Sequence, residues 1–260
     1  MDFENDMQEN LSAASPQERL ALINNYFAAA KNKSSALAAA RQAVRFITTN
    51  SNLVNAPLRE GESSKNLQNF RDAVDYWIQH APDYGQPRQV DRRVNFSPEF
   101  LEEILNKGIL TDMAFTATTE IPMDPDATYP FRNTLLHINS RWAADVSHVS
   151  SDGHIQEHLL PSHARFQIVK GHIDQHDLGD FPGAHPVKAR LWLQQIEPAP
   201  ERQVPDPWTG LVRTRMQESS SIAPEPASAR FDVGGRDSGS KARHELLSVD
   251  RTRGRSGLRR

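Results

Sequence analysis

Residues 135–169 read LLHINSRWAADVSHVSSDGHIQEHLLPSHARFQIV, and short apolar runs in this stretch alternate with polar and turn-forming residues. Asp152-Gly153 is a turn signal, because both residue types accept the backbone conformations that reverse a chain. Apolar runs of this length, bounded in this way, are typical of strands. We therefore expect strands over 134–139, 142–147, 156–160 and 164–170.

The segments on either side favour further short strands and one short helix. In residues 188–196 small or aliphatic side chains alternate with polar or bulky ones: Ala189, Leu191 and Leu193 alternate with Arg190, Trp192 and Gln194. This is the period of a half-buried strand. Ser97-Pro98 opens a helix that is expected to end at Gly108. Two more strands are expected over 89–94 and 113–118.

The region before residue 82 carries helical patterns. Ser15-Pro16-Gln17-Glu18 combines a capping box with proline at the first helical position, and it predicts a helix over 16–31. An alanine-rich segment predicts a second helix over 34–48, followed by a turn-rich stretch. An apolar stripe predicts a third helix that ends before Pro82. Helices first and strands afterwards indicate an α+β fold.

Composition divides the chain into three predicted parts. Residues 1–14 are polar and are expected to be a disordered leader. Residues 15–197 are expected to form the folded domain, with a helical lobe at 15–82 and a β core at 88–197. Residues 198–260 are rich in Pro, Ser, Gly and Arg and end in RTRGRSGLRR, which indicates a disordered basic tail.

Charge and residue usage exclude several classes of function. The net charge of -3 provides no general attraction to nucleic acid. The absence of cysteine excludes disulfides, thiol catalysis and cysteine-ligated zinc. No apolar run approaches the roughly 18–20 residues that span a bilayer. We expect no nucleic-acid partner and no membrane partner, and we expect a monomer.

A histidine- and aspartate-rich segment near 172–185 invites a metal-site interpretation. His172 and His176 have a spacing that would place them on one face of a helix. Gly171, Gly179 and Pro182 disfavour a helix there. We therefore predict a polar surface loop and no metal.

Three segments in order could carry chemistry: VDRRV at 90–94, DMAFTATT at 112–119, and QEHLLP at 156–161 followed by ARF at 164–166. Their order and spacing resemble the ADP-ribosyltransferase exoenzyme family, the mono-ADP-ribosyltransferases of Arg-Ser-Glu type. The family pattern is a strand-borne Arg, a helix and Gly, then AF-x-STS, then E-x-E-x-LLP-x-x-x-RF. The resemblance runs from about residue 35 to 197. It implies a helical lobe packed on a split antiparallel β-sandwich, with NAD as substrate.

The resemblance also implies a role for each matching residue. Glu157 would stabilise the positive charge that develops on the ribose, and Arg92 would bind the pyrophosphate. Thr119 would orient Glu157, and the segment 148–156 would meet the acceptor protein. The residues expected to hold NAD are Arg92, Arg93, Thr118, Thr119, Phe131 and Arg132.

Two departures from the family pattern bear on activity. Ala117 stands where the first Ser of the triplet is usual, and it lacks a hydroxyl. Ile155 stands where the family has its outer Glu, which activates an arginine acceptor. One interpretation is a transferase that modifies a host protein on a residue other than arginine. The alternatives are a catalytically degenerate module that binds a partner protein, and an unrelated α+β protein in which Glu157 is an ordinary solvated strand residue.

The N-terminal segment bears on location. It lacks the basic and apolar regions of a secretory signal peptide. Its polar composition suits cytoplasmic residence, and it equally suits a leader read by a bacterial injection machine. The chain resembles injected, type III secreted effectors of bacterial plant pathogens, which implies a virulence protein delivered into a host cell without a classical signal peptide.

Overall fold

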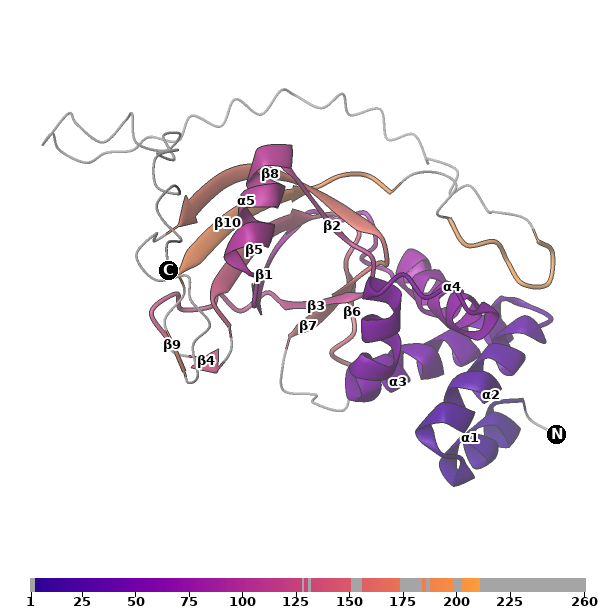
Figure 1. Ribbon diagram of the computed structural model, residues 1–260. Coiled ribbons are helices and arrows are strands. Elements are labelled where there is room, and N and C mark those ends of the chain that lie inside the picture. The colour runs from indigo at the N-terminus through magenta and orange to yellow at the C-terminus, as the bar shows by residue number, and fades with distance from the viewer. Residues whose placement is uncertain are drawn as a thin grey trace, which may run out of the picture. The chain divides into compact units, whose positions relative to one another are not determined.

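A computed structural model of the chain describes residues 3–127, 129–130, 132–150, 156–173, 184–185, 188–198 and 203–210 (Figure 1). Four helices come first: α1 (Phe3–Ala13), α2 (Pro16–Ala28), α3 (Lys33–Arg59) and α4 (Lys65–His80). The predicted capping box is present at α2, where the Ser15 amide donates to the Glu18 carboxylate over 2.8 Å. Figure 1 shows these four helices gathered in one lobe beside the strands.

The expectation of a disordered leader is wrong for residues 3–13. Met7 and Leu11 lie four residues apart on α1, and they are 1% and 8% exposed because they pack into the helical lobe. The Tyr26 hydroxyl also donates to Asp6 over 2.9 Å. Two apolar side chains on one helix face are enough to hold α1 on the helical lobe, because they join its apolar core.

Helix α3 continues well beyond the predicted end at residue 48. Asn50 has a non-helical backbone (φ -129°, ψ 36°), so the helix is kinked at the expected turn but does not stop there. Val54 and Leu58 lie beyond the kink and are buried, and they continue the apolar face of the helix. Burial of this face therefore outweighs the local turn signals.

Eight strands form one sheet, in the order β2-β8-β10-β5-β1-β3-β7-β6. Their bounds are β1 (Arg88–Val94), β2 (Ile109–Asp112), β3 (Thr116–Thr119), β5 (Thr134–Ser140), β6 (Ala144–Asp145), β7 (Glu157–Leu160), β8 (Ala164–Ile173) and β10 (Ala189–Gln195). A separate pair joins β4 (Tyr129–Pro130) to β9 (Ala184–His185). The eight-stranded sheet is antiparallel except between β10 and β5.

The sheet is nearly divided between β1 and β3, where one residue pair, Asp91 and Thr119, is in register. We call β2, β8, β10, β5 and β1 the large half, and β3, β7 and β6 the small half. The predicted α+β fold, with a helical lobe on a split and mostly antiparallel sheet, is confirmed. Strand β2 was not expected, and the strand predicted at 113–118 begins later, at Thr116.

Two apolar cores support the two halves. The lobe helices share one core with the small half, through residues such as Phe115, Val146 and Leu159. Helix α5 (Pro98–Lys107) packs Leu101 and Ile104 against the large half. The small half is therefore held mainly by the helices, and this decides where its side chains lie relative to β1.

Residues 203–210, which we call the strap, lie in the predicted disordered tail but bind to the helical lobe. The Val204 amide donates to Gln79 over 3.0 Å, and the Tyr76 hydroxyl donates to Asp206 over 2.9 Å. Trp208 packs against the helical core. Residues 211–260 lie outside the described part of the chain. Of the helices that are described, none has the length and apolar character to cross a membrane.

Candidate functional site

A cleft of about 400 Å³ is lined by residues from α3, β1, β3 and β7. Arg92 enters it from β1 in the large half, and Glu157 enters it from β7 in the small half. Thr119 on β3 pairs with Asp91 on one side and with Glu157 on the other. Strand β3 therefore lies between β1, which carries Arg92, and β7, which carries Glu157.

Arg92 is positioned to offer hydrogen-bond donors to a ligand. Its guanidinium donates one hydrogen bond, to the Ala117 carbonyl over 3.1 Å. Because a guanidinium has five N–H groups, it can donate to a ligand as well. Burial lowers the pKa of Arg92 to about 10; Asp112 opposes this shift, while nearby Arg59 and Arg132 add to it. Arg92 therefore stays charged at neutral pH and can bind an anionic group.

Arg93 also lines the cleft, but its guanidinium bonds to the loop after β3. It donates to the Ala127 carbonyl over 2.9 Å and to the Asp124 carbonyl. Arg132 donates to the Arg93 carbonyl over 2.8 Å, and its side chain lines the cleft. Arg93 is therefore a loop anchor at the cleft edge, while Arg132 is exposed.

Asp91, which precedes Arg92 on β1, holds the same loop. Its carboxylate accepts from the Met123 amide over 2.9 Å and lies 2.8 Å from His137 Nδ1. Met123 itself lines the cleft. Asp91 and Arg93 flank Arg92, and both bond to the loop that borders the cleft.

The structure does not bring the predicted threonine hydroxyls into the cleft lining. Ala117 lines the cleft, and strand alternation turns Thr118 to the opposite face, where its hydroxyl donates to the His158 carbonyl over 3.0 Å. The Thr119 hydroxyl accepts from the Ile121 amide over 3.1 Å. Thr119 is nevertheless the strand partner of Glu157, so it contributes backbone pairing there.

Several predicted residues cannot be placed. Phe131 and Ile155 lie outside the described residues, as do 151–154 of the expected acceptor loop. The same applies to His176 and most of the loop around it, whereas His172 is exposed on β8.

The Glu157 carboxylate is partly buried at the start of β7. The backbone amide of Glu157 donates to Ser147 Oγ over 2.9 Å, which fixes the strand end. Within the described part of the chain, no protein group is hydrogen-bonded to the carboxylate itself. The carboxylate can therefore interact with a ligand in the cleft.

Helix α3 forms a wall of the cleft that the sequence prediction missed. Thr48, Ser51 and Asn55 line it. Asn55 accepts from the Phe115 amide over 3.1 Å and donates to the Phe115 carbonyl over 3.2 Å, which fixes the chain just before β3. Ser51 and Asn55 are four residues apart, so a polar helical stripe was available as a signal once the helix was known to continue.

A second clamp joins the end of α3 to the chain before β3. Arg59 makes two hydrogen bonds with Asp112, over 3.1 and 3.0 Å, and Asp112 also accepts from Thr116 Oγ1 over 2.6 Å. Burial alone raises the pKa of Asp112. The bonds from Arg59, Thr116 and the Ala114 amide outweigh it and hold the pKa below 3.8.

We expect Asp112→Asn to lower the free energy of unfolding by about 2 kcal/mol at pH 7, because charge-assisted bonds are lost. A carboxylate whose folded pKa is depressed stabilises the fold above its unfolded pKa, and this contribution is lost as the pH falls through the folded value. Urea unfolding of wild type and variant at pH 7 and pH 3 measures the effect. An equal difference at both pH values would contradict the assignment.

No protein-family model matches the chain, and no curated protein matches its sequence. Solved structures match by fold. The type III effector XopAI from Xanthomonas axonopodis pv. citri is 18% identical over 73% of this chain and 74% of its own, with a TM-score of 0.50. The ADP-ribosyltransferase HopU1 of Pseudomonas syringae pv. Tomato DC3000 is 17% identical over 61% of this chain and 77% of its own, with a TM-score of 0.48.

Exoenzyme S from Pseudomonas aeruginosa, in a complex with human 14-3-3 protein beta and bound to Carba-NAD, is 13% identical over 74% of this chain and 88% of its own, with a TM-score of 0.48. ADP-ribosyltransferase exoenzymes and type III effectors recur among the similar structures. The likeness to XopAI shows a shared fold.

Proposed function

We propose that this chain is a mono-ADP-ribosyltransferase that uses NAD as substrate and modifies a protein of a host cell into which it is injected. The observation that carries the proposal is the placement of Arg92 and Glu157 in one cleft, from opposite halves of the split sheet. The volume of about 400 Å³ is in the usual range for a small-molecule site. The residue pattern of the family supplies the identity of the substrate.

Glu157 and the cationic residues have complementary tasks in this reaction. The bond between the nicotinamide nitrogen and ribose C1′ breaks, and the electron pair leaves with nicotinamide. Positive charge remains on the ribose as an oxocarbenium-like centre, which the Glu157 carboxylate stabilises. Arg92, with Arg132 beside it, binds the pyrophosphate and holds the other end of the substrate. A nucleophile of the acceptor protein then attacks C1′ and loses a proton.

The acceptor is proposed to be a residue other than arginine. An arginine side chain is protonated at neutral pH, so it needs a base before it can attack. Ile155 stands two residues before Glu157 and has no such base. A side chain that is nucleophilic without deprotonation by this position, or water, would complete the reaction.

A degenerate site is the second candidate, and Ala117 favours it because it brings a methyl group to the cleft where the family has a hydroxyl. Purified full-length protein incubated with NAD separates the two. Release of nicotinamide, with labelled ADP-ribose transferred to a host-cell protein, supports the enzyme. NAD binding without release supports the degenerate module. Absence of both binding and release overturns the NAD site.

A further inference from the structure

The turn at 161–163 directly follows the strand that carries Glu157. It leads from β7 in the small half to β8 in the large half. Because β1 and β3 share one register pair, the sheet itself does little to fix the two halves relative to each other. Arg92 and Glu157 lie on different halves, so their separation depends both on the side-chain bonds between β1 and the β3 segment and on what holds this turn.

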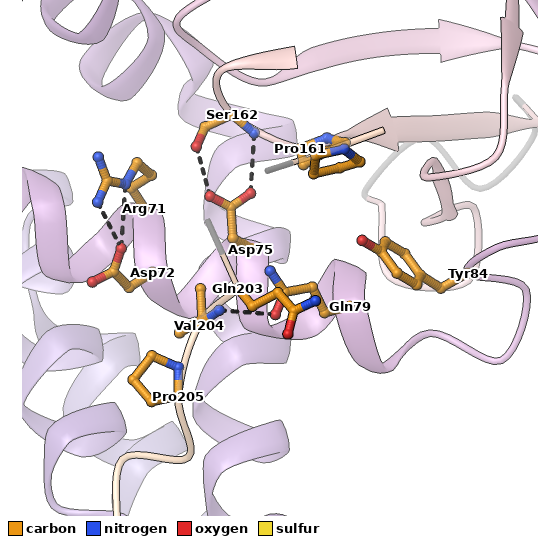
Figure 2. Close-up of a pocket in the computed structure, with 11 residues that line it drawn as sticks. Arg71, Asp72, Asp75, Gln79, Tyr84, Pro161, Ser162, Gln203, Val204 and Pro205 are labelled. Atoms are coloured by element: carbon orange, nitrogen blue, oxygen red, sulfur yellow. Dashed lines mark hydrogen bonds and ion pairs between the residues drawn. The ribbon is translucent and has the colours of Figure 1, made fainter. Parts of the chain in front are cut away.

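Asp75 on α4 holds it with two hydrogen bonds (Figure 2). The carboxylate accepts from the Ser162 amide over 3.0 Å and from Ser162 Oγ over 2.6 Å. Asp75 is 6% exposed and Ser162 is 9% exposed, so water competes little for these bonds. A carboxylate is seldom buried, and this one accepts hydrogen bonds from both the backbone and the side chain of a single turn residue.

The backbone of the turn needs such a restraint. His163 has φ 56°, a left-handed conformation that residues other than glycine adopt uncommonly, and its Nδ1 lies 3.3 Å from Ser162 Oγ. A conformation of this kind persists where the surroundings determine it strongly. The two hydrogen bonds that Ser162, the residue before His163, donates to Asp75 restrain the backbone here.

The strap encloses the same region. A cavity of about 170 Å³ beside Asp75 is lined by α4, the turn and the strap, and Val204 is bonded to Gln79 at its edge. Figure 2 shows Asp75 between Ser162 and the strap residues Gln203 to Pro205. The helical lobe thus holds both neighbouring strands of the small half: β3 through Asn55 and Phe115, and β7 through Asp75 and Ser162.

We propose that Asp75 is a positioning residue that sets the place of Glu157 relative to Arg92 by holding the turn at 161–163 on α4. This inference rests on the proposed function of the cleft. Asp75 does not line the cleft; it acts through the turn and β7. A displacement of about 1 Å at a reacting group can cost on the order of 100-fold in rate.

The test compares Asp75→Ala, which removes the tie, with Asp75→Asn, whose amide can accept from the Ser162 amide and donate to Ser162 Oγ. Asp72→Ala is the matched control, because Asp72 lies on the same helix and lines the same cavity but is paired with Arg71 instead of the turn. We expect Asp75→Ala to lower kcat for nicotinamide release at least tenfold with KM for NAD changed less than threefold. Asp75→Asn and Asp72→Ala should stay within threefold of wild type in kcat. Ser162→Ala, which loses one bond, serves if Asp75→Ala does not fold.

Hydrogen exchange provides a readout that does not need activity. Amides of 158–160, 162 and 163 should exchange at least tenfold faster in Asp75→Ala, and at the wild-type rate in Asp75→Asn and Asp72→Ala. If wild type releases no nicotinamide while exchange changes as expected, the proposed function fails but the tie stands. Folded Asp75→Ala with wild-type exchange and kcat overturns the positioning role, whatever the activity of the wild type.

The tie also has a signature in pH. Burial raises the pKa of Asp75 from 3.8 to about 7, although the bonds from Ser162 and the charge of Arg71 act against it and Asp72 adds to it. Other titratable groups on the elements around it are Tyr76 and His80 on α4, Tyr84 in the cavity lining, His163 on the turn and Asp206 on the strap. A folded state that holds this proton more tightly than the unfolded chain loses stability as the pH rises from about 4 to 7.

We therefore expect the melting temperature of Asp75→Asn, relative to wild type, to rise as the pH is raised from 5 to 8. The variant has no carboxylate to ionise at this position, so it does not lose stability there. Thermal unfolding monitored by circular dichroism at closely spaced pH values measures the difference. A difference that is constant across the range would show that Asp75 is not shielded as the structure indicates.

Discussion

Glu157→Gln is expected to slow nicotinamide release by about 10³-fold. The substitution keeps the shape of the side chain and removes its charge, so it isolates the electrostatic contribution. A charge pair about 4 Å apart is worth roughly 4 kcal/mol at an effective dielectric constant near 20. Because each 1.36 kcal/mol is about tenfold in rate, this corresponds to a loss of about three orders of magnitude.

The structure predicts that this loss occurs without a loss of fold or of NAD binding. The Glu157 carboxylate has no hydrogen-bond partner among the described protein residues, and β7 is fixed by the backbone of Glu157 through Ser147. Initial rates of nicotinamide release, with melting temperature measured in parallel, test this. Glu102→Gln on α5 is the matched control, because Glu102 is exposed and does not line the cleft. A rate within threefold of wild type would remove Glu157 from the mechanism.

The parts of the fold that follow local patterns were predictable. Capping residues marked the start of α2 and α5, and alternation or short apolar runs marked β1, β5, β7 and β10. The family resemblance also implied that Arg92 and Glu157 would hold one NAD molecule, and both side chains line one cleft. These predictions succeed because each depends on residues close in sequence, or on a family pattern that already contains the tertiary arrangement.

The parts that failed depend on contacts between distant segments. Asn50 looks like a helix end, yet α3 continues because Val54 and Leu58 find a core. The strap has the composition of a disordered tail, but Asp206 and Trp208 dock on the helical lobe. Composition averages over a segment and cannot register a few well-placed side chains.

Within the candidate site, the missed features are polar groups whose roles appear only in three dimensions. In the sequence Asn55 falls in the expected turn-rich stretch and Asp75 falls in the third predicted helix, and a polar side chain at either position is expected to face water. Both instead bond to the ends of small-half strands. The Thr118 hydroxyl lies elsewhere than expected for the opposite reason. Thr118 matched a family position, but strand alternation directs its hydroxyl to His158 rather than to the cleft.

Arg92→Ala is expected to weaken NAD binding by about 100-fold. Charge-assisted hydrogen bonds contribute roughly 1.5–3 kcal/mol each, and a guanidinium can make two parallel bonds to phosphate. A loss of about 3 kcal/mol corresponds to about two orders of magnitude in Kd. The measurement is isothermal titration of NAD into the Glu157→Gln background, in which turnover does not consume the ligand.

Arg92→Lys separates charge from geometry in the same titration. An ammonium keeps the positive charge but cannot present two parallel donors, so it should recover only part of the affinity. Arg132→Ala should cost less than Arg92→Ala, because Arg132 is the more exposed of the two and water competes more strongly for its bonds to a ligand. If Arg92→Ala binds NAD as tightly as its parent, Arg92 does not bind the pyrophosphate, and its proposed role is wrong.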